Sequence, residues 1–363
     1  MECYKLSSIE SLIQNEQIIN EKIEKTLYEK LKKSKNKIDN DKINWEKSKK
    51  CMNMYEYIYT SSNNINNISS FYPISRSYFK LREILYNFNI KEYINKNNII
   101  CLCEAPGGFI QCFKEISKEK DYKINSINVI TLLSKSNQIP YWSNHIISDR
   151  SINIHCGEDG TGDIFILKNI LKFIKDNQRN KSMIITGDGG FDYSIDYNKQ
   201  EELSYPLIYS EIMIAISLQK IDGVFICKIF DIFNLGTLQL IYLLYLSYNE
   251  VFLYKPKMSR LSNSEKYIIC KGFKGYNKEI MNLLIHNFKK EYINIKLPKE
   301  FIDDIHNYNK IFVNMQILNI ENCFMKKKYT NFQQKVEISK EWCIKYDIPI
   351  NYDSKYFKNI YHK

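Results

Sequence analysis

The feature that most constrains the fold is an alternation of short apolar β-type runs with helical segments, which begins near residue 72. Strands that alternate with helices of this length build a parallel sheet that helices cover on both faces. The last two runs, 250–254 and 267–271, leave no room for a helix between them, so we expect them to pair antiparallel. The expected strands are 99–103, 127–132, 152–156, 183–186, 223–228, 250–254 and 267–271, and the expected helices are 109–118, 164–175, 201–218 and 237–246.

These elements predict an α/β fold over residues 71–275, with a Rossmann-like, seven-stranded, mostly parallel sheet and a terminal antiparallel hairpin. In the basic N-terminal extension, 1–70, Ile23, Leu27 and Leu31 lie four apart, which predicts a helix. Two interpretations are open: a solvated helix that covers the core, or a basic arm that contacts RNA. Residues 60–70 are typical of a linker or exposed loop. The C-terminal extension, 276–363, is helical and then aromatic and basic.

Composition narrows the classes of function. The formal charge of +11 favours an anionic partner, although solubility or an A+T-rich genome would also explain the excess of lysine. No apolar run reaches the ~18 residues of a membrane span and no signal peptide is evident, so we expect a soluble, unexported protein without a membrane partner. Cys101, Cys103, Cys227 and Cys270 lie in apolar runs, which indicates free thiols in a reducing compartment. The absence of a Cys-x-x-Cys pair and the five scattered histidines predict no structural metal.

The stretch "NIICLCEAPGGFIQCF", 98–113, places two adjacent glycines directly after the first expected strand. In an α/β sheet this turn faces the ligand crevice, and Gly107 and Gly108 allow a ligand to approach the main chain closely. The Gly-x-Gly-x-x-Gly spacing of a dinucleotide site is missing. The carboxylate of Glu104 suits a ligand with a cationic end, such as the amino group of S-adenosylmethionine, and repels pyrophosphate. The alternative is a tight turn that binds nothing.

Four segments in chain order resemble the FtsJ-like ribose 2′-O-methyltransferases, which include the mRNA cap-modifying enzymes. They are "SRSYFKL" (75–81), "EAPGGF" (104–109), "GDGGFD" (187–192) with "FICKIFD" (225–231), and "SRLSNSEKYIIC" (259–270). Other stretches, such as "GTGDI" (160–164), are similar to the eukaryotic second cap methyltransferase and its relatives in large cytoplasmic DNA viruses. The resemblance spans about 73–273. It implies a methyltransferase fold with S-adenosyl-L-methionine as cofactor and capped mRNA as substrate, and it leaves other capping enzymes open as partners.

The resemblance also implies site residues. The family's catalytic Lys-Asp-Lys-Glu set falls on Lys80, Asp188, Lys228 and Glu265. Asp163 matches the position that contacts the cofactor adenine, with N-capping of the next helix as an equal alternative. Many methyltransferases bind the cofactor ribose through an acid after the second strand, but residues 127–136 offer none. The cofactor-binding residues are then Glu104, Ala105, Pro106, Gly107, Gly108, Phe109, Asp163 and Asp188.

The chemistry of these residues depends on the charge of one lysine. A lysine with an ordinary pKa of ~10.4 is protonated near neutral pH and is a poor base. Burial and a neighbouring Lys80 would lower the pKa of Lys228, whereas Asp188 and Glu265 would raise it. We assign Lys228 as base or hydroxyl-orienting group, Asp188 as its anchor near the methyl group, and Lys80 and Glu265 as positioning and tuning groups. The sequence is compatible with either role for Lys228, general base or hydroxyl-orienting group.

Three of these residues also have a purely structural interpretation. Asp188 could shape a turn, Lys80 could be a solvated helix residue, and Glu265 could be a surface acid at a strand end. Lys228 differs because it lies inside the apolar run "GVFICKIF", where a lone lysine is usually functional.

Candidate substrate contacts come from loops and cations. Tyr141 and Trp142, in an exposed loop between the second and third strands, would stack on a base or pack locally. Arg76, Arg260 and the lysine run 326–328 are candidates for phosphate contacts.

The favoured function is therefore 2′-O-methylation in the cap region of mRNA. The alternatives are methylation of an internal or ribosomal RNA ribose, and a non-catalytic RNA-binding module on the same fold. We expect a cytoplasmic protein, in a viral factory or virion if the source is a large DNA virus, and allow a nuclear one if the source is a cell.

Overall fold

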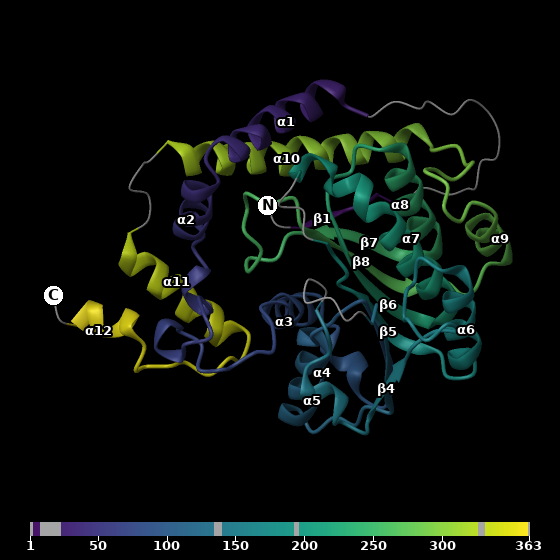
Figure 1. Cartoon of the computed structure of the whole chain (residues 1–363), viewed down its shortest axis with the longest axis horizontal. Helices are drawn as coiled ribbons and strands as arrows, with labels where there is room; N and C mark the ends of the chain where they lie inside the picture. The colour runs from purple at the N-terminus through teal and green to yellow at the C-terminus, as the bar shows by residue number, and fades with distance from the viewer. Residues whose placement is uncertain (1–2, 8–22, 134–139, 192–195, 326–330, 362–363) are drawn as a thin grey trace.

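The residues that the structure describes, 3–7, 23–133, 140–191, 196–325 and 331–361, form one mixed sheet with helices on both faces, shown in the computed structural model of Figure 1. Its eight strands are β1 (Cys3–Lys5), β2 (Asn98–Leu102), β3 (Ser126–Ile130), β4 (Ile152–His155), β5 (Ser182–Gly187), β6 (Gln219–Ile229), β7 (Tyr248–Tyr254) and β8 (Lys266–Phe273). The strand order is β1-β7-β8-β6-β5-β2-β3-β4. Strands β6, β5, β2, β3 and β4 pair in parallel, whereas β8, β7 and β1 pair antiparallel with their neighbours.

The predicted α/β class and the antiparallel hairpin of β7 and β8 are confirmed. The predicted strand count was one too low, because β1 pairs with β7 in the register Cys3 to Tyr254. A strand of three residues is too short to show an alternation of apolar and polar side chains, so no local pattern predicts it.

The helices divide between two hydrophobic cores, one on each face of the sheet. Successive residues of a strand point to opposite faces, and accordingly Ile100 belongs to one core and Ile99 to the other. Helices α6, α7, α8 and α9 pack in the first core, and α3, α4 and α5 pack in the second. The helices are α1 (Lys25–Asn40), α2 (Lys42–Met52), α3 (Ser77–Asn87), α4 (Gly108–Glu119), α5 (Asn144–Ile147), α6 (Leu167–Asn177), α7 (Gln200–Leu218), α8 (Leu235–Ser247), α9 (Lys278–His286), α10 (Lys299–Phe324), α11 (Phe332–Lys345) and α12 (Lys355–Tyr361). Short 3₁₀ turns are η1 (Glu56–Ile58), η2 (Asn64–Asn66), η3 (Lys91–Ile94) and η4 (Tyr197–Lys199).

The N-terminal and C-terminal extensions pack against each other. Figure 1 shows α1 lying along the long helix α10, while α2 turns away from α1 and contacts α10 near its C-terminal end. A third apolar cluster joins the three helices through Leu31, Ile38, Trp45, Val313 and Ile320. The described part of the N-terminal extension thus covers other helices with its apolar face. Residues 8–22 of this extension lie outside the described residues.

The stretch 60–70 is less exposed than the sequence predicts. Ile68 and Ser69 are fully buried, and Ser69 forms an isolated β-bridge with Ile350. The Asn67 side chain accepts a hydrogen bond from the Thr60 N–H at 2.7 Å, which folds the stretch back on itself. The prediction of an exposed loop is wrong for residues 67–69, because a segment almost three hundred residues away covers them.

All ten cysteines are free, and Cys101, Cys227 and Cys270 are buried as their apolar surroundings predict. Cys103 is only half-buried. Within the described ranges, every helix is too short or too polar to cross a membrane.

Candidate functional site

Three of the four residues of the expected catalytic set lie at one edge of the sheet. Strands β2, β5 and β6 are parallel, so their carboxyl ends meet there, while antiparallel β8 begins at the same edge. Asp188 follows the last residue of β5, and Lys228 is the next-to-last residue of β6. Glu265 directly precedes β8, whose Tyr267 pairs with Lys228.

The structure brings the four side chains together as two ion pairs. The Nζ of Lys80, on α3, lies 2.6 Å from Oε1 of Glu265. The Nζ of Lys228 lies 3.3 Å from Oδ1 of Asp188 and donates a hydrogen bond of 2.7 Å to the Asp188 carbonyl oxygen. All four side chains keep only 11–15% of their surface exposed. These charges therefore face a site that is largely shielded from water.

The carboxylates determine the charge of Lys228. Burial lowers the pKa of Lys228, but Asp188, Glu265 and Glu211 together outweigh burial, and the pKa is raised above its ordinary value. Lys80 does not free the Lys228 amine, because the charge of Lys80 is paired with Glu265. The expectation that a neighbouring lysine would lower the pKa of Lys228 is therefore wrong for this arrangement.

Glu265 stays ionised despite its burial. Burial raises the pKa of Glu265, but Lys80, Lys228 and Lys255 overcome it and hold the pKa at about 2. Lys255, in the connection from β7 to β8, also donates a hydrogen bond of 2.5 Å to the Glu265 carbonyl oxygen. Sequence reasoning missed Lys255, which looks like one more surface lysine in a lysine-rich chain.

Two further buried residues hold the Asp188 turn, and sequence reasoning missed both. The Tyr267 hydroxyl donates a hydrogen bond of 2.7 Å to Oδ1 of Asp188. On α7, Oε1 of Glu211 accepts a hydrogen bond of 3.3 Å from the Gly189 N–H, and burial raises the pKa of Glu211 to about 8. The two-residue spacing of Glu265 and Tyr267, which would put both on one face of a strand, is the signal that could have indicated Tyr267.

The double-glycine turn connects β2 to α4 beside this set. Gly107 has φ of 116°, a conformation that favours glycine, and its N–H donates to the Glu104 carbonyl oxygen at 2.8 Å. A Cβ at Gly108 would collide with the side chains of Ser75 and Ser77 at the start of α3. The motifs 75–81 and 104–109 therefore pack directly against each other, which places Lys80 next to the turn.

Glu104 fits the cationic ligand that the sequence predicts. Its side chain is 4% exposed, and Oε1 accepts a hydrogen bond from the Thr186 hydroxyl. Oε2 has no hydrogen-bond partner within the described part of the chain. Burial raises the pKa of Glu104 well above its ordinary value, with Asp188 and Glu211 adding to the effect. A buried carboxylate oxygen without a donor is a fitting acceptor for an ammonium group.

Asp163 does not cap the helix that follows it. Helix α6 begins at Leu167 with Ile166 at the N-cap position, three residues beyond Asp163. Oδ1 of Asp163 instead accepts a hydrogen bond of 2.8 Å from the Phe165 N–H, which forms a local turn. The N-cap interpretation is wrong, and the adenine contact stays a prediction.

The predicted substrate contacts have different environments. Arg76 and Arg260 both bind Glu56, with Nη2–O distances of 3.3 Å and 2.7 Å. Tyr141 is 54% exposed, as expected of a base-stacking residue, whereas Trp142 is 3% exposed and packs in the core that contains α4. The expectation of an exposed Trp142 is wrong. The lysine run 326–328 lies outside the described residues.

Part of the chain is similar to known proteins. Residues 73–273 match the model of a family described as FtsJ-like methyltransferase. The chain is similar to cap-specific mRNA (nucleoside-2′-O-)-methyltransferase 1 of Trypanosoma brucei brucei, with 27% identity over 66% of this chain and 66% of the relative. It is 28% identical to methyltransferase 2 of the same description from Mus musculus, over 80% of this chain and 43% of the relative. The Homo sapiens methyltransferase 1 is 35% identical over 43% of this chain and 20% of the relative. The chain thus spans only part of the length of each of these relatives.

Proposed function

The chain belongs to the FtsJ-like methyltransferase family, and from this we propose that it transfers a methyl group from S-adenosyl-L-methionine to a ribose 2′-hydroxyl in the cap region of mRNA. The single observation that carries the proposal is the meeting of the Lys80–Glu265 and Lys228–Asp188 ion pairs beside the Glu104 turn. The similarity to cap-specific mRNA methyltransferases supports the cap region as the substrate.

The residues of the turn would hold the cofactor. Glu104 is the proposed acceptor for its amino group, and Asp163 is the proposed contact for its adenine. When bound, S-adenosyl-L-methionine supplies an electrophilic methyl group on a sulfonium. The acceptor ribose then binds beside the side chains of Asp188 and Lys228.

Lys228 acts in this proposal as the group that orients the acceptor. Its raised pKa makes it an ammonium near neutral pH, and an ammonium donates hydrogen bonds but cannot accept a proton. It would donate to the ribose oxygen and stabilise the negative charge that this oxygen gains as its proton leaves for water, before the oxygen forms the C–O bond in place of the methyl–sulfur bond. Asp188 fixes the direction of the amine, and the Lys80–Glu265 ion pair places a second carboxylate near Lys228.

The test is methyl transfer to a short capped RNA by Lys228→Ala and Lys228→Arg variants. Both should lose activity by about 10²-fold or more, since alanine removes the donor and arginine places its donors differently. Calorimetric binding of S-adenosyl-L-methionine should persist in both, which shows that the fold is retained. Near-normal transfer by Lys228→Ala would remove Lys228 from the mechanism.

A further inference from the structure

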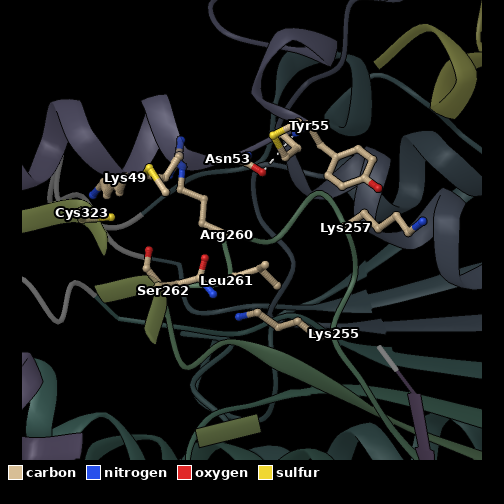
Figure 2. Close-up of a pocket in the computed structure, with 12 residues that line it drawn as sticks. Lys49, Asn53, Tyr55, Lys255, Lys257, Arg260, Leu261, Ser262 and Cys323 are labelled. Carbon is tan, nitrogen blue, oxygen red and sulfur yellow. Dashed lines mark hydrogen bonds between the residues drawn. The ribbon is translucent and has the colours of Figure 1, made fainter. Parts of the chain in front are cut away.

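A basic pocket lies on the far side of the segment that carries Glu265, and it uses residues from both extensions. It has a volume of about 80 Å³ and is lined by Lys49, Met52, Asn53, Met54, Tyr55, Lys255, Lys257, Arg260, Leu261, Ser262, Asn319 and Cys323. Figure 2 shows how α2, α10 and the β7–β8 connection surround it. Of these lining residues, four are lysine or arginine and none is an acid.

Two of the four cations build the wall of the pocket. The Nζ of Lys255 donates hydrogen bonds to Asn263 and Glu265 carbonyl oxygens, at 2.7 Å and 2.5 Å. Arg260 binds Glu56 through Nε and Nη2, at 3.1 Å and 2.7 Å. These bonds fix the segment 255–265, so the pocket and the catalytic set share one rigid wall.

The other two cations are placed to meet a ligand. Lys49 is on α2, where it pairs with the exposed Glu46, and its Nζ lies 6.0 Å from the centre of the Trp45 ring. The Nζ of Lys257 lies 5.5 Å from the centre of the Tyr55 ring. The Lys49 side chain is 17% exposed and that of Lys257 is partly exposed. An anion could therefore replace water around them without the cost of uncovering a buried charge.

The surface next to the pocket is basic as well. Helix α2, "KINWEKSKKCM", has Lys42, Lys47, Lys49 and Lys50 against the single acid Glu46. Lys47 and Lys50 are exposed. Exposed lysines beside a pocket lined by cations can contact the phosphate backbone of a nucleic acid.

We propose that α2 and the β7–β8 connection form a phosphate-binding surface for the substrate RNA, with Lys49 and Lys257 as the contacting cations. This inference rests on the proposed function for the identity of the ligand, and it assigns to the N-terminal extension a role outside the methyltransferase segment 73–273. The space of the pocket suits a phosphate group with a few waters, because each water needs roughly 10–15 Å³ of such volume.

The experiment compares the full-length protein with a Lys49→Ala/Lys257→Ala variant in binding to a labelled capped RNA over a range of salt concentrations. Each neutralised phosphate of a single strand contributes about 0.7 to the slope of log K against log salt, so the slope should fall by about 0.7 if both lysines bind one phosphate and by about 1.4 if each binds its own. The matched control is Lys274→Ala/Lys278→Ala, which removes two exposed lysines near α9, at the other end of the molecule from α2 in Figure 1. The control should keep the wild-type slope.

Two RNA ligands identify the source of the phosphate. A loss seen with an uncapped oligonucleotide assigns the contact to the RNA backbone, and a loss seen only with a capped dinucleotide assigns it to the triphosphate bridge of the cap. Either result supports the inference, whereas equal slopes in the double variant and the wild type overturn it. Methyl transfer by the wild-type protein is measured in the same samples. If these lysines bind RNA and no methyl group is transferred, the proposed activity fails while the phosphate-binding surface stands.

Discussion

Lys35, on the N-terminal helix α1, forms a buried ion pair with Asp231, three residues beyond Lys228: its Nζ lies 2.6 Å from Oδ2 of the aspartate. Both side chains are less than 10% exposed. The Ser264 hydroxyl, next to Glu265, donates a hydrogen bond of 3.0 Å to the same carboxylate oxygen. Asp231 thus joins the N-terminal extension to the two segments that position Lys228 and Glu265.

Lys35→Ala should destabilise the protein strongly, because it leaves the Asp231 carboxylate buried without its main partner. The expected loss is about 3–5 kcal/mol in the free energy of unfolding, measured with urea. Lys37→Ala is the matched control on the same helix, since Lys37 pairs with Glu321 at a partly exposed position. That control should lose about 1 kcal/mol or less. Equal losses in the two variants would show that Lys35 does not anchor the extension.

Tyr267→Phe should reduce methyl transfer while the protein stays folded, because it removes the hydrogen bond that holds the Asp188 carboxylate. A hydrogen bond to a charged group contributes about 1.5–3 kcal/mol, so kcat should fall by roughly 10- to 100-fold if the bond acts in the transition state.

Tyr248→Phe is the control for this variant. Tyr248 is also buried, and its hydroxyl donates to Gln219 at 3.2 Å at the start of β7, away from the catalytic edge. Both variants should lose a similar amount of stability, and only Tyr267→Phe should lose activity. If Tyr267→Phe and Tyr248→Phe lose activity to the same extent, the role of Tyr267 is structural only.

Glu104→Gln should weaken the binding of S-adenosyl-L-methionine, because it removes the charge offered to the amino group and keeps the size of the side chain. Loss of a charged hydrogen bond predicts about 10- to 100-fold weaker binding by calorimetry. A cofactor analogue without the amino group provides the control, since the variant and the wild type should bind it equally. If Glu104→Gln binds the natural cofactor as tightly as the wild type does, a residue other than Glu104 contacts the amino group.

Cofactor binding should also release a proton and should strengthen as the pH rises. Burial raises the pKa of Glu104 in the free protein, so the carboxyl holds its proton at a pH where an ordinary glutamate is ionised. A bound ammonium group lowers that pKa and drives the proton off, which makes affinity increase with pH up to the raised pKa. Calorimetry in buffers of different ionisation enthalpy measures the released proton, and Glu104→Gln should abolish it. If the wild type binds the cofactor equally at every pH and releases no proton, Glu104 is not the acceptor for the amino group.

The sequence predicted the central sheet well, because each central strand is a compact apolar run bounded by polar turns. The sequence did not predict β1, because this strand has only three residues and forms only by pairing with β7. The burial of Ile68 and Ser69 depends on Pro349 and Ile350, and no local pattern reports contacts across such a distance.

In the site, too, local sequence patterns predicted some residues and missed those whose roles depend on distant contacts. Lys228 was identifiable as functional since it interrupts an apolar strand, and the turn at Gly107 was identifiable from its residue types. Lys35 was not identifiable from the sequence, because a buried lysine in a lysine-rich helix has the same local pattern as its solvated neighbours. The charge of Lys228 also required coordinates, because burial and three carboxylates act on it in opposite directions.

The most direct test of the central claim is to locate, by mass spectrometry of nuclease fragments, the methyl group that the protein adds to a short capped RNA. We predict one methyl group on the 2′-oxygen of a cap-proximal ribose, and none when Lys228→Ala replaces the wild type under conditions where the variant still binds the cofactor. A methyl group on a base or on an internal ribose, or an unchanged product from Lys228→Ala, would contradict it.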